Sequence, residues 1–173
     1  ENTGTVKIGE GRPIVLDGRL GSAEFAGSVS IGGTAAANTI DEYEEGSYTP
    51  VFNAGSYSYA FQIGSYVKIG SLVTVIFDLQ ISSVTTATTG TVQISLPFTN
   101  NNVSGGGIMY PSGILSVVSN LANSKNANSI QAQNNTGLVS VKLLNGSSGS
   151  AVRYEDLQAN SRLSGSITYT TIQ

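Results

Sequence analysis

The sequence predicts an all-β protein: an antiparallel β-sandwich or jelly-roll head that follows a short fibrous β-segment and assembles as a trimer. Three observations lead to this fold class. Residues 66–81 alternate apolar and polar side chains beside a glycine turn. Many further short runs of β-branched residues are separated by glycine- and asparagine-rich turns, and no apolar pattern with a helical period persists along the 173 residues.

Residues 66–81 are predicted to form a β-hairpin. Two β-rich runs flank Gly70-Ser71, and a two-residue connection with glycine first is typical of a type II′ turn. A turn of this length pairs Ile69 with Leu72 across the two arms. We therefore expect the arms to be neighbouring antiparallel strands.

The two faces of the longer hairpin arm differ in character. Because side chains alternate along a strand, one face is wholly apolar and carries Val73, Val75, Phe77, Leu79 and Ile81. The other face mixes polar residues with Leu72 and Ile76, and Ile69 extends its apolar part across the turn. We expect a second sheet to cover the first face and a neighbouring subunit to cover the second, which places Ile69, Leu72 and Ile76 in a trimer interface.

Composition narrows the class of protein. Charged residues make up 11% of the chain, and the abundance of Ser, Thr, Asn and Gly is typical of extracellular or virion β-proteins. A net charge of −3 argues against nucleic acid as a partner, and zero Cys excludes disulfides and thiolate zinc sites. No apolar run approaches the ~20 residues that span a bilayer, so we expect no membrane insertion. The chain begins with Glu1 and shows no signal peptide, so we expect a processed product or a fragment of a longer protein.

Residues 1–40 differ from the rest of the chain. Their short apolar pieces are broken by glycines, and none is long enough to cover a core alone. Two interpretations stay open: a flexible linker, and a fibrous segment that folds only by wrapping with copies of itself. The regular return of β-branched residues favours the second. We therefore divide the chain into a fibre-shaft-like segment, 1–40, and a β-sandwich head, 41–173.

The head begins with a charged stretch and continues as many short strands. Residues 41–50 hold four carboxylates within five positions, followed by Pro50, and a solvated edge strand is favoured there over a Ca²⁺ site. The later strands are predicted at 51–52, 58–63, 66–69, 72–81, 90–96, 107–110, 114–118, 129–133, 138–144 and 165–172. In the last of these, Ile167, Tyr169 and Thr171 share one face.

Several motifs of the head resemble a known family. Residues 41–50 read Asp-Glu-Tyr-Glu-Glu-Gly-Ser-Tyr-Thr-Pro, similar to the pattern D-[DE]-Y-E-E-G-x-[WY]-T-P. Residues 64–75 read Gly-Ser-Tyr-Val-Lys-Ile-Gly-Ser-Leu-Val-Thr-Val, similar to G-x-Y-x-K-I-G-x-x-V-x-V, and residues 96–98 give the Leu-Pro-Phe of a third motif. Residues 165–169 approach a terminal S-G-x-Y pattern with the order altered. These motifs resemble the C-terminal β-sandwich module of tail-fibre proteins from tailed bacteriophages and prophages.

The resemblance covers residues 41–173 and implies a function as well as a fold. It implies a receptor-binding head at the tip of a homotrimeric fibre on the virion, outside the cell. The partners it implies are identical copies of the chain, other virion tail proteins and a host cell-surface receptor, for which we expect a glycan. It carries over no catalytic residue. A virion decoration or assembly protein that never contacts a receptor is the alternative within the same fold.

The residue types give catalysis little support. Zero His and zero Cys remove the usual general base and the thiol nucleophile, so a Ser-His-Asp arrangement is impossible. A pair of carboxylates can hydrolyse glycans, but the adjacent acids Glu155 and Asp156 would point to opposite faces of a strand. We predict a non-enzymatic protein without cofactor or metal, and keep a glycan-degrading tailspike-type enzyme as a second alternative.

Aromatic and amide side chains are the candidates for glycan contact. Tyr57, Tyr59 and Phe61 alternate and are expected to share one strand face, where they either pack in the core or offer a platform for a sugar ring. The full set of candidates is Tyr57, Tyr59, Tyr110, Asn101, Asn102, Asn134 and Asn135, although asparagines in such clusters also simply make turns. Receptor contacts are expected on loops at the end of the head away from the shaft, and the candidate loops are 99–106, 120–128 and 134–137.

Overall fold

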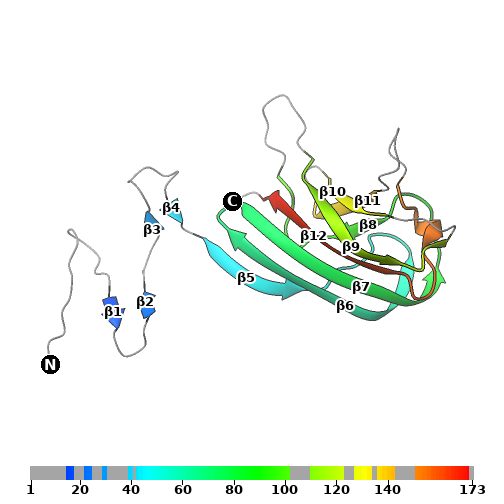
Figure 1. Cartoon of the computed structure of the whole chain (residues 1–173), viewed down its shortest axis with the longest axis horizontal. Coiled ribbons are helices and arrows are strands. Elements are labelled where there is room, and N and C mark those ends of the chain that lie inside the picture. Colours follow the sequence, from blue (N-terminus) through cyan, green and yellow to red (C-terminus); the bar gives the residue numbers. More distant parts are fainter. Residues whose placement is uncertain are drawn as a thin grey trace. The chain divides into compact units, whose positions relative to one another are not determined.

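The computed structural model describes residues 15–17, 22–24, 29–30, 39–40, 42–101, 110–122, 127–133, 136–142 and 151–171. The chain divides into two units, Glu1–Tyr43 and Glu44–Gln173. The large sheet belongs to the second unit, as Figure 1 shows.

The described part of the first unit consists of short strands. β1 (Val15–Asp17) pairs with β2 (Ser22–Glu24), and β3 (Val29–Ser30) pairs with β4 (Thr39–Ile40), each time antiparallel. Strands of two or three residues are shorter than the usual strand. The intertwining of this segment with its copies stays a prediction.

In the described part of the second unit, eight strands form one sheet in the order β5-β6-β7-β12-β9-β10-β11-β8. Their bounds are β5 (Tyr43–Tyr48), β6 (Ser56–Ile69), β7 (Leu72–Thr86), β8 (Gln93–Ser95), β9 (Ser112–Ser119), β10 (Ser129–Ala132), β11 (Leu138–Lys142) and β12 (Arg162–Thr170). A short 3₁₀ turn, Tyr154–Asp156, precedes β12. The pairings from β6 through to β8 are antiparallel. The predicted all-β antiparallel class is confirmed.

The sheet folds over on itself into two layers. The long strands β5, β6, β7, β12 and β9 form one layer, and β10, β11 and β8 lie behind it in Figure 1. Residues 51–53, which follow β5, bond to β8: the Ser95 N–H donates to the Val51 carbonyl (2.9 Å), and the Asn53 N–H donates to the Gln93 carbonyl (3.0 Å). Hydrogen bonds therefore connect the first strand of the sheet order, β5, to the last, β8, through residues 51–53. This closure is consistent with a β-sandwich.

The core lies between the two layers, and β7 is its centre. The predicted inner row of β7 is confirmed: Val73, Val75, Phe77, Leu79 and Ile81 are all buried. Ile94, Ile130 and Val139 face them from the second layer. The predicted row of Ile167 and Tyr169 on β12 and Thr171 directly after it is buried as well. This apolar packing is the main favourable term in the stability of the head.

The hairpin between β6 and β7 forms as predicted. Ile69 pairs with Leu72 across the turn. Gly70 has a φ of 56°, the positive value that a type II′ turn needs at its first central position. Glycine adopts this conformation without the steric cost that a side chain would add.

β6 departs from the sequence prediction in two respects. It is one strand of 14 residues, whereas separate strands at 58–63 and 66–69 were expected. The expectation that Phe61 shares a face with Tyr57 and Tyr59 is wrong. The register between β6 and β7 shifts between Tyr59 and Phe61, and this bulge turns Phe61 to the opposite side.

The adjoining strands β5 and β6 are locked by two reciprocal glycine–tyrosine contacts. The ring of Tyr48 on β5 lies where a side chain at Gly64 on β6 would stand. In return, Tyr66 on β6 occupies the place of a side chain at Gly46, where a Cβ would lie 2.7 Å from the tyrosine oxygen. The Tyr66 hydroxyl also donates to Glu44. The two most specific family-like motifs, 41–50 and 64–75, are thus neighbours in space.

Candidate interaction surfaces

The strands of the head have two distinct ends. We call the end at which β5 begins the near end, and the opposite end the far end. The Tyr66–Glu44 contact places the start of β5 beside the end of β6, so the Gly70-Ser71 turn between β6 and β7 also lies at the near end. At the far end, β6 begins and β7 finishes, since Tyr57 pairs with Val84. These two ends are separated by roughly 40 Å at the usual strand rise of about 3.3 Å per residue.

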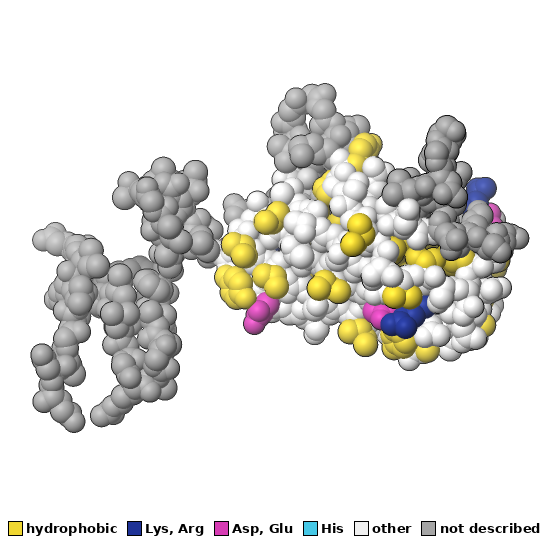
Figure 2. All heavy atoms as spheres, in the orientation of Figure 1, with side chains coloured by type: hydrophobic (Ala, Val, Ile, Leu, Met, Phe, Trp, Pro, Cys, Tyr) yellow, Lys and Arg dark blue, Asp and Glu magenta, His cyan; other side chains and the backbone are white. Residues whose placement is uncertain are grey.

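The outer face, meaning the solvent-facing side of β6, β7, β12 and β9, is the first candidate surface. Its large apolar side chains are 39–64% exposed, and they are Ile63, Val67, Ile69, Leu72, Ile76 and Ile114. Ile76 pairs with Ser166, and Ser166 pairs with Ile114, so these side chains share one face across three strands. Figure 2 shows hydrophobic side chains distributed over this side of the molecule among uncharged polar ones. The three predicted interface residues, Ile69, Leu72 and Ile76, all lie on it.

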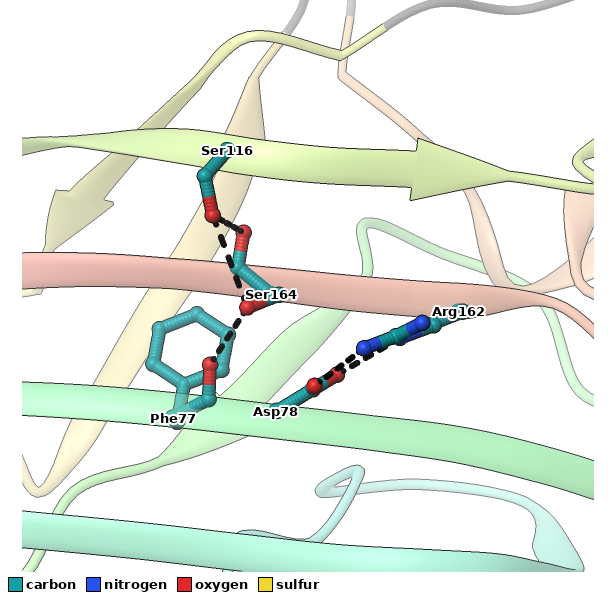
Figure 3. Close-up of polar contacts among 5 residues, drawn as sticks. All are labelled: Phe77, Asp78, Ser116, Arg162 and Ser164. Carbon is teal, nitrogen blue, oxygen red and sulfur yellow. Dashed lines mark hydrogen bonds and ion pairs between the residues drawn. The ribbon is translucent and has the colours of Figure 1, made fainter.

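A polar cluster lies on the same face, further toward the far end (Figure 3). Arg162 on β12 forms a two-pronged pair with Asp78 on β7, with N–O distances of 3.0 and 2.6 Å, and its guanidinium lies 5.2 Å from the centre of the Phe61 ring. The hydrogen bond to Asp78 raises the pKa of the Arg162 guanidinium. Beside the pair, the hydroxyl of Ser164 donates to the Phe77 carbonyl (3.2 Å), and the hydroxyl of Ser116 donates to the Ser164 carbonyl (3.3 Å). These contacts tie β7, β12 and β9 together.

The second candidate is a hollow of about 490 Å³ at the near end. It is lined by Leu72, Asn101, Tyr110, Pro111, Thr168, Tyr169 and Thr170. Tyr110 is 47% exposed, whereas Tyr169 is buried and its hydroxyl is bonded to the backbone of Phe98. The lining combines an aromatic ring and aliphatic groups with amide and hydroxyl groups.

Backbone hydrogen bonds fix the walls of this near-end hollow. The Asn101 N–H donates to the Thr170 carbonyl (2.8 Å), and the Thr171 N–H donates to the Ser71 carbonyl (2.8 Å), beside Leu72. The Pro111 carbonyl, in turn, accepts a hydrogen bond from the Ala132 N–H (2.8 Å). Segments distant in the sequence therefore meet in a defined arrangement.

Tyr57 and Tyr59 lie at the far end and pack among other aromatic rings. Tyr57 meets Phe52 edge to face, with ring centres 5.3 Å apart. The hydroxyl of Tyr59 accepts a hydrogen bond from the Phe52 N–H (3.1 Å). Burial, together with neighbouring Tyr154, raises the pKa of Tyr57 to about 12. Of the two interpretations left open for these tyrosines, packing against the core agrees with this environment.

The structure thus brings together only part of the predicted glycan-contact set. Tyr110 and Asn101 line one hollow, Tyr57 and Tyr59 lie at the other end, and Asn102, Asn134 and Asn135 fall outside the described residues. Leu72, Thr168, Tyr169 and Thr170 were not predicted as glycan contacts, because they meet only through the pairing of β12 with β7. Loops 99–106 and 134–137 connect at the near end and 120–128 at the far end, as far as their described residues show.

The acidic residues form no metal-binding cluster in the described ranges. Among those residues, no three acidic side chains are grouped so that they could hold a metal ion. Glu155 and Asp156 lie in a 3₁₀ turn. Glu155 pairs with Arg153 (3.2 Å), while the buried Asp156 accepts a hydrogen bond from the Arg153 N–H (2.9 Å). A search of the described helical segments finds none with the length and apolar character needed to cross a membrane.

Comparison with known proteins adds no assignment. No family description matches this chain, and a search of curated proteins finds no match either.

Proposed function

We propose that this chain is the distal, receptor-binding head of a homotrimeric tail fibre of a tailed bacteriophage or prophage, and that it attaches the virion to a glycan on the host cell surface. The proposal assigns the chain a structural and recognition role without catalysis. Its basis in the sequence is the set of motifs in residues 41–98 that resemble the fibre module. Its basis in the structure is the exposed apolar outer face.

The outer face carries the proposal because its composition suits contact with another protein surface. Six large aliphatic side chains stand half-exposed on one side of the head, with few charges among them. Six exposed aliphatic side chains that share one face of a sheet, alternating with uncharged polar ones, suit contact with another protein surface. A second and third copy of the chain are the partners that the fibre proposal supplies, and an obligate interface of this kind buries more than ~2,000 Å².

A virion decoration or assembly protein is the second candidate function. The same outer face would serve self-association there, so the fold does not separate the two roles. They differ in whether the isolated protein attaches to host cells.

The proposal is tested by sedimentation and by cell attachment on the same protein. Ile76→Asp places a charge in the middle of the outer face, so we expect dissociation of the trimer at micromolar concentration. Ser83→Asp places the same charge at an exposed position further along β7 and serves as the matched control. Attachment to candidate host cells is measured before and after their surface polysaccharide is stripped, and stripping should abolish it.

A wild-type protein that sediments as a monomer would overturn the trimeric head. A trimer that attaches to no candidate host cell would favour the decoration or assembly role instead.

A further inference from the structure

We infer that the near-end hollow binds one ring of an uncharged saccharide, with the exposed face of Tyr110 as the stacking surface. This inference rests on the proposed function, because it gives the attachment to host glycans a site and a chemical class of ligand. It places that site beside the Gly70-Ser71 turn, at the end where the chain enters β5, and so departs from the expectation that receptor contacts lie at the opposite end of the head.

The lining of the hollow matches the two kinds of surface on a neutral sugar. The ring of Tyr110, together with Pro111 and Leu72, can cover the C–H face of a pyranose. Asn101, Thr168 and Thr170 carry amide and hydroxyl groups, which pair well with sugar hydroxyls. The volume of about 490 Å³ falls within the ~300–1,000 Å³ of typical small-ligand sites.

The charge of the lining argues for a neutral ligand. The seven lining residues that the structure describes include no acid and no base. A carboxylate or phosphate bound here would lose part of its hydration without gaining an ionic partner from these side chains, which is costly. Sialic acids and uronic acids are therefore disfavoured relative to neutral hexoses and N-acetylhexosamines.

The polar part of the lining also argues against an apolar side chain from a second copy as the occupant. Leu72 belongs to both the hollow and the outer face, so a neighbouring subunit is the main competitor. The Thr168 hydroxyl already shares a hydrogen bond with the Thr74 hydroxyl (3.0 Å). An apolar side chain would cover the Asn101 amide and the Thr170 hydroxyl without offering either of them a hydrogen-bond partner. A ligand rich in hydroxyls satisfies them.

The hollow is built before the ligand arrives. Asn101 is anchored to Thr170, Pro111 to Ala132, and the Asn100 side chain, fully buried, donates to the Gln133 carbonyl (3.1 Å). Walls held in this way lose little further conformational freedom on binding, which favours affinity for a small ligand. Repetition of the site on three subunits would raise weak single-site binding through effective concentration.

The experiment is ligand-observed NMR titration of the full chain with a panel of methyl glycosides. Neutral probes are the glycosides of glucose, galactose, mannose and N-acetylglucosamine; charged probes are those of sialic acid and glucuronic acid. We expect at least one neutral probe to bind and the charged probes not to bind. Tyr110→Ala should weaken that binding about three- to tenfold, the effect of losing a stacking partner, while Tyr110→Phe should retain it.

Tyr43→Ala is the matched control, since Tyr43 is 63% exposed and lies outside the hollow. Circular dichroism and sedimentation of every variant check that fold and assembly are preserved. No binding by any neutral probe, tighter binding of a charged probe, or equal binding by Tyr110→Ala would each overturn the inference. Loss of the trimer in Tyr110→Ala would assign the hollow to a neighbouring subunit and overturn it too.

The two proposals fail separately. If the protein attaches to host cells through polysaccharide but Tyr110→Ala attaches equally well, the hollow is excluded and the fibre-head function stands. If the wild type attaches to no cell, the function fails on a measurement that does not involve the glycosides.

Discussion

The inner and outer faces of β7 differ although both carry large aliphatic residues. Phe77 and Val75 on the inner face are completely covered, while Ile76 between them is 59% exposed. Each fully buried side chain of this size contributes about 1.5–3 kcal/mol from the removal of apolar surface from water, whereas Ile76 gains little of this within one chain. A strand can thus be apolar on both sides for two reasons: one face builds the fold, and the other, as we propose, contacts a partner.

Replacement of Phe77 by Ala tests the inner face and should have the largest effect. The cavity and the lost contacts should lower the free energy of unfolding by about 3–5 kcal/mol. Ile76→Ala is the neighbouring control, and in the monomer it should change stability by less than about 0.5 kcal/mol. Urea unfolding at a concentration at which the protein is monomeric gives both values; similar losses for the two variants would break the contrast between the faces.

Gly64→Ala tests whether the edge of the inner face is packed as tightly as its centre. The added methyl group would collide with the ring of Tyr48, so overpacking should cost about 1–3 kcal/mol. Ser65→Ala, one position further and exposed, should be near neutral. Thermal unfolding of the two variants measures the difference, and an unchanged melting temperature for Gly64→Ala would show that the ring moves aside freely.

Alkaline titration tests the packing of Tyr57 and should give the smallest effect. The pKa of Tyr57 is raised to about 12 in the folded protein from its usual 10.0, so the unfolded chain ionises first. The stability that this tyrosine contributes is complete below pH 10 and is lost as the pH rises toward 12. Urea unfolding across this range should show a shallower decline for Tyr57→Phe than for the wild type; equal declines would contradict a buried environment.

Local patterns predicted the centre of the fold well. The inner row of β7 and the register of the hairpin follow from alternation and from one glycine turn, and both depend on residues close together in the sequence. Phe61 was misplaced because a bulge breaks the alternation, and nothing in the residues around Ala60 announces a bulge. Gly64 was taken as a break between strands, whereas it makes room for a ring from the adjoining strand.

The candidate site was predicted only in part, because its geometry depends on long-range pairing. Tyr110 and Asn101 were selected for their chemistry, and the structure places both in one hollow. Thr168 and Thr170 join them because β12 pairs with β7, some 95 residues earlier in the chain. The same pairing determines at which end of the head each loop lies. The sequence alone therefore did not show that loop 120–128 lies at the far end and loop 99–106 at the near end.

The reciprocal contacts of Gly46 with Tyr66 and of Gly64 with Tyr48 have a consequence for evolution. Each glycine leaves space that only the partner strand's ring fills, so a larger residue at one position is compatible with the fold only when the opposite ring becomes smaller. Among related sequences we therefore expect these positions to covary in two crossed pairs. The motifs at residues 41–50 and 64–75 then form one structural unit, although the intervening chain separates them in the sequence. A homologue that keeps one of these motifs should therefore keep the other.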